Sequence, residues 1–332
     1  MAFNTICKFP DIDIYLLYFL DLITIANITV LSKEQYYLIN EQNFVKELYA
    51  LINRQESAAE LYLLKGKKPI KISNIIDYAS LDNCISLIKY MDESVNKFEF
   101  TNNAIKYASF NAHINVLEWF DKSKYEFNYS GAIDVAACRG NINVLDWFDK
   151  SKYDFIYTVG AIDVVACEGN INVLEWFDKS KYEFEYSVNA IDSAAAYSHI
   201  NVLNWFDKSK YKFKYSIFAI IWASKNGHID VLDWFDNSVY EFKHSCLWFQ
   251  AIDSAAGNGQ IEVLNWFDNS AHEFKYSVYA INNASNNGHI GVLEWFKNSK
   301  YKVLYTKDAI SGAKKNNHAD IVEWFEQYEK SL

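Results

Sequence analysis

Histidine and aspartate are the side chains of this sequence that could bind a metal or move protons, and both recur at fixed places. Five of the seven histidines fall where turns are expected, at His113, His199, His228, His289 and His318. One carboxylate recurs in the same way, at Asp134, Asp163, Asp192 and Asp253. Groups spaced a repeat apart form neither the close pair that acid–base catalysis needs nor a metal-ligand cluster. A Gly-rich phosphate loop, a nucleophile elbow and an H-E-x-x-H motif are also missing. We therefore expect a non-enzymatic protein without a metal or cofactor.

The regular spacing reflects an internal repeat. One aromatic position recurs at steps of 29, 28, 29, 29, 29, 32, 29 and 29 residues, at Tyr90, Trp119, Trp147, Trp176, Trp205, Trp234, Trp266, Trp295 and Trp324. A fixed period of this length is typical of stacked-repeat architectures. The predicted units are 73–100, 101–129, 130–157, 158–186, 187–215, 216–244, 245–276, 277–305 and 306–332.

Each unit reads as two short helices. In the third unit Ala132, Ile133, Ala136 and Ala137 share one face of a first helix, and Gly140 ends it. A hydroxyl residue that can cap the first turn stands three positions before the Ala-Ile pair in most units, at Thr101, Thr158, Ser187, Ser216, Ser277 and Thr306.

The second helix of the third unit is apolar over most of its circumference, at Ile142, Val144, Leu145, Trp147 and Phe148. This breadth is expected of a helix that packs between two neighbouring units. Burying one Trp would remove on the order of 150–250 Å² from water and contribute about 4–6 kcal/mol per unit before chain entropy is subtracted. A single unit could not bury this surface, so we expect its stability to come from the neighbouring units.

Aromatic and polar residues alternate in the connectors between units, for example at Tyr125, Phe127 and Tyr129. Period two predicts extended segments whose aromatics lie on one side. These aromatics would form either a packed edge of the core or, as the alternative, an aromatic ligand site. The first interpretation is the simpler one.

The repeat motif A-I-D-x-A-A-x-x-G-[NH]-I-x-V-L-x-W-F resembles the core of ankyrin repeats, in particular the shortened repeats of large DNA viruses. The T-P-L-H segment of ordinary ankyrin repeats is missing, and the unit is about four residues shorter than the usual 33. The resemblance implies an all-α solenoid of nine stacked helix–turn–helix repeats over 73–332. Residues 53–72 would connect it to a small helical module at 1–52.

Composition favours a protein partner in a reducing compartment. The net charge of −10 and the absence of a basic stripe argue against nucleic acid. Five cysteines without a C-x-x-C pair suggest neither disulfides nor zinc. The N-terminus does not resemble a secretory signal. We expect a cytoplasmic monomer, in the host-cell cytoplasm if the protein is viral.

Residues 12–31 are nearly apolar, but Asp13, Asp21 and Asn27 interrupt them, so membrane insertion is the less favoured interpretation. Residues 8–49 resemble an F-box, a module that docks a Skp-type adaptor of cullin ubiquitin ligases. The matching positions are Pro10, Ile14, Leu17, Leu20, Leu31, Ser32 and Lys33, whereas Gln35 replaces the usual Trp. A plain helical cap on the first repeat is the alternative.

Positions that differ between units are candidates for partner binding, because residues that bury a common face stay alike. At the end of the first helix these are Phe110, Arg139, Glu168, Tyr197, Asn226 and Asn258. In ankyrin-like stacks this helix lines the concave side, which commonly binds proteins; variation without any ligand is the alternative.

Two irregularities suggest an aromatic anchor. Ile221 and Trp222 replace an Asp-Ser pair, and the 32-residue step inserts residues near Trp248 and Phe249. Trp222, Trp248 and Phe249 could cluster as a protein contact, or the insert could repack locally. Three functions remain open: an adaptor that presents a target protein to a Skp/cullin-type ligase, a scaffold or sequestering protein that uses repeats alone, and a membrane-tethered repeat protein.

Overall fold

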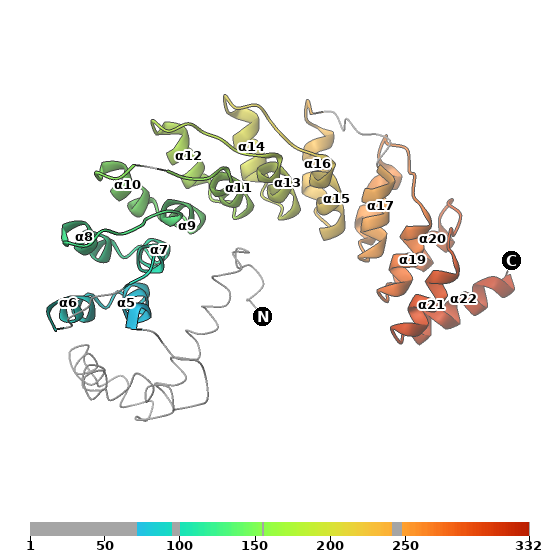
Figure 1. Cartoon of the computed structure of the whole chain (residues 1–332). Helices are drawn as coiled ribbons and strands as arrows, with labels where there is room; N and C mark the ends of the chain where they lie inside the picture. The colour runs from blue at the N-terminus through green and yellow to red at the C-terminus, as the bar shows by residue number, and fades with distance from the viewer. Residues whose placement is uncertain (1–71, 95–99, 155, 241–247, 332) are drawn as a thin grey trace, which may run out of the picture. The chain divides into compact units, whose positions relative to one another are not determined.

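The computed structural model describes residues 72–94, 100–154, 156–240 and 248–331 (Figure 1). All regular secondary structure in these residues is α-helical, and successive helices pair across short turns. The predicted all-α helical-repeat solenoid is therefore confirmed. The chain divides into two compact units, Met1–Ala161 and Ile162–Leu332.

Each repeat contributes a first and a second helix. In the first unit the first helices are α5 (Ile72–Leu81), α7 (Asn103–Phe110) and α9 (Ala132–Cys138), and the second helices are α6 (Ile85–Ser94), α8 (Ile114–Lys122) and α10 (Ile142–Lys150). Helix α11 (Val159–Cys167) contains the boundary between the units. The first helices that follow are α13 (Val188–Ala196), α15 (Ile217–Asn226), α17 (Trp248–Gly257), α19 (Val278–Asn286) and α21 (Lys307–Lys315). The second helix α12 (Ile171–Lys179) follows α11. The five first helices just given are followed in order by α14 (Ile200–Lys208), α16 (Ile229–Asp236), α18 (Ile261–Asn269), α20 (Ile290–Asn298) and α22 (Ala319–Ser331).

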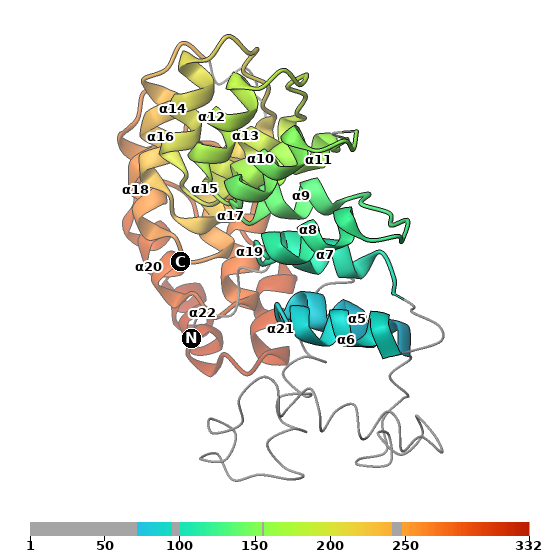
Figure 2. The same cartoon turned by 90° about the vertical axis from the view of Figure 1, so that its left-hand side faces the viewer.

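In the second unit the two kinds of helix form two rows. Helices α13, α15, α17, α19 and α21, which we call the first-helix row, pack closely on one another, while α14, α16, α18 and α20 touch more loosely (Figure 2). Small residues permit the close approach: a Cβ added to Gly257 of α17 would lie 2.9 Å from the Cβ of Asn283 on α19. Because the first helices are closer together, this unit bends toward the first-helix row, where the sequence predicts a binding surface.

The main core side chain is the Phe that follows the recurring Trp, not the Trp itself. Phe206 is 0% exposed, as are its equivalents to within about 1%: Phe120, Phe148, Phe177, Phe235, Phe267, Phe296 and Phe325. Trp205 and its equivalents are partly exposed except Trp324, which is 6% exposed in the last pair. The burial expected for the recurring Trp between neighbouring units is therefore only partial. The indole instead bridges repeats, as where Trp234 Nε1 donates to Asn204 Oδ1 at 2.8 Å.

The recurring aspartate binds the N-cap of the next first helix. Asp192 of α13 accepts a hydrogen bond from the backbone N–H of Ser216 at 2.8 Å and another from the Ser216 hydroxyl. Ser216 in turn accepts from Phe218 N, as predicted for a cap. We call this arrangement the Asp–cap contact. It recurs in Asp77–Thr101, Asp134–Thr158, Asp163–Ser187 and Asp253–Ser277, and with an amide in Asn282–Thr306.

Both residues of the Asp–cap contact are replaced together where the repeat length changes. At the 28-residue step, Lys106 takes the Asp position and Tyr129 the cap position. At the 32-residue step, Ile221 and Trp248 take them. Each regular 29-residue step from Tyr90 onward keeps an Asp or Asn with a Ser or Thr. The contact therefore fixes the register of regular neighbours, because a change in connector length moves the cap away from the carboxylate.

The turn histidines pack against the preceding repeat. Gly259 has φ +75°, and a Cβ added there would lie 2.8 Å from His289 Nδ1. Burial, and then the nearby His318, lower the pKa of His289 below its ordinary value. His113 Nε2 lies 2.9 Å from the carbonyl oxygen of Leu81. These contacts give the histidines a structural place, and the described residues contain no group of acidic, His or Cys side chains able to hold a metal.

The connectors are extended and carry aromatics that stack on the next repeat. Phe213 lies 4.0 Å from Tyr240, measured between ring centroids, and is 8% exposed. The same stacking recurs in Phe184–Tyr211 at 4.2 Å and Phe274–Tyr301 at 4.1 Å. These contacts support the interpretation of the connector aromatics as a packed edge of the core.

Candidate functional site

The predicted partner-binding residues lie at the ends of first helices. In the first unit Phe110 ends α7 and Arg139 caps α9, with the guanidinium carbon 4.5 Å from the Phe110 ring centroid. In the second unit Tyr197 caps α13 and is 52% exposed, while Glu168 follows α11 and is half-buried. Arg139 and Phe110 thus form a cation–π contact with one another. The ring of Tyr197, in contrast, is exposed to solvent.

The asparagines in this group have a structural role that sequence variation did not reveal. Asn226 Nδ2 donates to the carbonyl oxygen of Ala196, at the end of the preceding first helix, at 2.8 Å. Asn287 and Asn316 repeat the bond to Gly257 and Asn286. Asn258 differs, because its amide donates to Ser254 O of α17, the helix that it follows. These side-chain amides donate to carbonyl oxygens that a helix end leaves without an intrahelical partner. An asparagine engaged in this way has fewer hydrogen-bonding groups left for a binding partner.

Trp222 belongs to an aromatic pair on α15. Its ring stacks on Phe218, one turn earlier, with a centroid distance of 5.3 Å and an interplanar angle of 27°. Phe218 is 49% exposed and Trp222 is partly exposed. The preceding first helix, α13, carries Asn189 and Ser193 at the equivalent positions. The pair therefore places two aromatic rings at positions that are polar in α13, and α19 carries Tyr279, 62% exposed, at the position of Phe218.

Sequence reasoning found Trp222 but missed Phe218. The signal was present, since residues four apart share a helix face, and Phe218 stands four before Trp222. The predicted contact of Trp222 with Trp248 and Phe249 stays a prediction. Phe249 is half-buried in α17, and the side chain of Trp248 is not among those that the structure describes.

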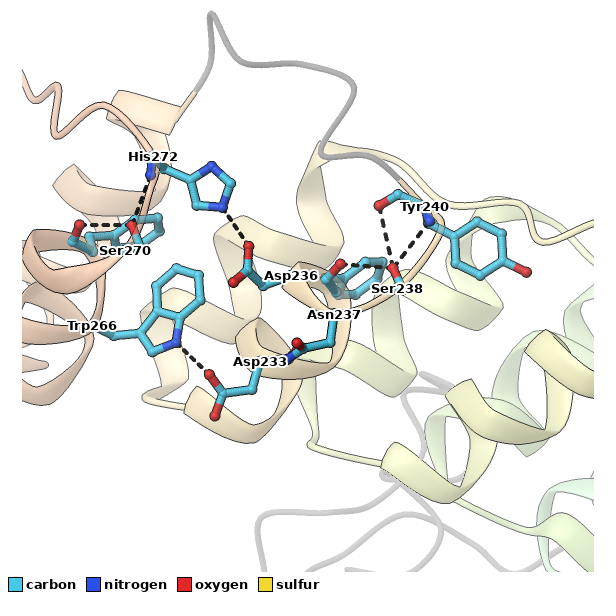
Figure 3. A network of polar contacts seen from close by, with 10 residues as sticks. Asp233, Asp236, Asn237, Ser238, Tyr240, Trp266, Ser270 and His272 are labelled. Carbon is cyan, nitrogen blue, oxygen red and sulfur yellow. Dashed lines mark hydrogen bonds and ion pairs between the residues drawn. The ribbon is translucent and has the colours of Figure 1, made fainter.

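The second helices of this region carry an open acidic cleft. It encloses about 460 Å³ and is lined by Asp207, Asp230, Asp233, Trp234, Asn237, Ser238 and Val239. Its carboxylates are already engaged: Asp233 accepts from Trp266 Nε1 at 2.6 Å, and Asp230 accepts from the Ser198 hydroxyl. Figure 3 shows Asp233 and Asp236 directed at Trp266 and His272 of the next repeat. These bonds join repeats, and the arrangement offers no paired acid and base for catalysis.

The predicted adaptor-docking residues lie outside the described residues. They are Pro10, Ile14, Leu17, Leu20, Leu31, Ser32 and Lys33. The apolar stretch 12–31 falls in the same part. Within the described residues, no helix has the length and apolar character to span a membrane.

The sequence matches no known protein family and no curated protein. Similar solved structures include the pentatricopeptide repeat protein PPR10 from maize, with a TM-score of 0.34 and 10% sequence identity. The similarity covers 86% of this chain and 48% of that one, so the chain spans about half the length of that protein. A likeness this distant carries no information on partners or ligands.

Proposed function

We propose that this chain is a protein-binding scaffold that holds a partner on its first-helix row, with Phe218 and Trp222 as the main anchors. The stacked pair on α15, with Phe218 49% exposed and Trp222 partly exposed, is the observation that carries the proposal. Rigid aromatic side chains at solvent are typical anchors of protein interfaces, because their burial removes a large apolar area at little cost in side-chain entropy. The polar residues around the pair would form the rim of such an interface.

Replacing the pair with the residues that α13 carries should weaken partner binding without unfolding the chain. The variant Phe218→Asn with Trp222→Ser copies Asn189 and Ser193, which a first helix of this protein already accepts. We expect partner affinity to fall by about tenfold or more, as for loss of interface anchors. Co-purification of the tagged chain with its partner, followed by titration calorimetry, measures this loss.

Val239→Ala is the matched control, because Val239 is 85% exposed and lies on the second-helix side of the same repeat. It should leave the affinity unchanged. Equal binding by the wild type and the double variant would exclude the pair as the anchor.

The finer proposal is that residues 1–52 couple the bound partner to a Skp/cullin-type ubiquitin ligase. It rests on the F-box resemblance of the sequence alone, around Pro10, Leu20 and Leu31. In this form the protein is an adaptor of ankyrin-like type that acts in the cytoplasm. The alternative is a repeat-only scaffold that sequesters its partner without any ligase.

Pro10→Ala with Leu20→Ala separates these two forms. If the coupling is correct, a Skp-type adaptor should co-purify with the wild type and disappear from the double variant. The partner held through Phe218 and Trp222 should remain bound in both. If a Skp-type adaptor stays bound to the variant, or never co-purifies with the wild type, the ligase coupling is wrong and the repeat-only scaffold is the remaining form of the proposal.

A further inference from the structure

The exposed charge on the helix that carries Phe218 and Trp222 is positive. Lys225 follows Trp222 by three residues, so Phe218, Trp222 and Lys225 lie along one face of α15. We call these three residues the α15 surface. Lys225 is exposed, and α15 contains no Asp or Glu.

Acidic side chains on the neighbouring first helices are withdrawn from solvent. The one carboxylate of α13, Asp192, is 1% exposed, and the one carboxylate of α17, Asp253, is 6% exposed. Both are occupied by Asp–cap contacts. In the described residues of α13, α15, α17 and α19, the charge presented to solvent is therefore the positive charge of Lys225.

The connector that leads into α15 is also basic. It carries Lys212 and Lys214 where the preceding connector has Glu183 and Glu185. Lys214 Nζ donates to Tyr186 O at 3.1 Å, and Lys212 is exposed. The exposed acidic residues of these repeats lie on second helices, including Asp230, Asp233 and Asp236 of α16, and on other connectors, at Glu183, Glu185 and Glu273.

We propose that the α15 surface binds an acidic peptide segment that carries a large apolar side chain. This inference rests on the proposed function and specifies its partner. The apolar side chain packs on the Phe218–Trp222 pair, and flanking carboxylates meet Lys225 and Lys212. In a chain of net charge −10, this surface offers an anionic segment a favourable field. A nucleic acid fits less well, because its many phosphates would approach the acidic second helices with few cations to neutralise them.

A library of short random peptides, displayed and selected on the full chain, tests the proposal. Enriched peptides should combine Leu, Ile, Phe or Trp with flanking Asp or Glu, and should not bind the Phe218→Asn, Trp222→Ser variant. For an enriched peptide, Lys225→Glu with Lys212→Glu should weaken binding by about threefold to tenfold, and added salt should reduce the difference. A peptide with its acids changed to Lys should reverse the preference between wild type and charge variant. Lys302→Glu, in the connector before α21, is the matched control and should have no effect.

The outcomes are distinct. Enriched peptides that need the aromatic pair but are basic, or ignore the charge reversal, would overturn this inference and leave the proposed function intact. Peptides that bind equally to the variant without the pair would overturn both. Binding of a single-stranded oligonucleotide that depends on Trp222 and exceeds that of the acidic peptides would overturn the choice of a protein segment.

Discussion

Phe206→Ala should cost about 3–5 kcal/mol of unfolding free energy, because truncating a fully buried Phe removes its transfer energy and leaves a cavity. Phe206 is 0% exposed on α14 and packs on the connector that precedes its repeat. Its ring centroid is 4.7 Å from that of Tyr186 and 6.2 Å from that of Phe184. Native-state hydrogen exchange of α13, α14 and α15 measures the loss locally, which matters because repeat stacks need not unfold in one step.

Trp205→Ala is the informative comparison, since the larger side chain is the more exposed one. Trp205 packs on Phe184 and Tyr211, with centroid distances of 5.5 and 6.0 Å, at the margin of the core. We expect Trp205→Ala to lose clearly less unfolding free energy than Phe206→Ala. A larger loss at Trp205 would contradict the assignment of Phe as the main core residue.

Asp192→Ala should destabilise the contact between α13 and α15 by about 1–3 kcal/mol, because it leaves two partly buried donors of Ser216 without their acceptor. Asp192→Asn should be close to neutral. The chain already carries this exchange: Asn282 accepts from Thr306 N at 3.0 Å and donates to its hydroxyl at 2.8 Å. Chemical denaturation of the two variants, with hydrogen exchange at the start of α15, tests both values. Equal losses for Ala and Asn would mean that the hydrogen bonds do not matter.

The stability difference between wild type and Asp192→Asn should also depend on pH. Burial raises the pKa of Asp192 above its ordinary value of 3.8, although the hydrogen bonds from Ser216 oppose this shift. The stability that Asp192 contributes is then fully present below the unfolded pKa and is lost as the pH rises through the folded pKa. Since Asn does not titrate, the stability of the Asn variant relative to wild type should increase from acid to neutral pH. If the stability of the Asn variant relative to wild type decreases from acid to neutral pH instead, the pKa of Asp192 in the folded state is lowered and not raised.

Much of the local structure follows from the sequence alone. The 29-residue period and the Ala-rich faces predict helical pairs, because a short amphipathic helix must bury its apolar side on a neighbour. The hydroxyl residues before each Ala-Ile pair predict the helix starts, and Ser187, Ser216, Ser277 and Thr306 all cap as expected. These features depend on residues within a few positions of each other, so the chain encodes them locally.

The contacts between repeats were decided only by tertiary structure. Trp205 and Phe206 are adjacent, roughly 100° apart around the helix, and both are apolar, so periodicity cannot say which one faces the core. The sequence shows Asp192 as a carboxylate that recurs once per repeat, and only the fold places it against Ser216, 24 residues away. Asn226 likewise occupies a position that varies between repeats, as a binding residue would, but its amide donates to the last carbonyl of α13. Each outcome depends on how one repeat is rotated and shifted on the next, and a single repeat's sequence does not contain that geometry.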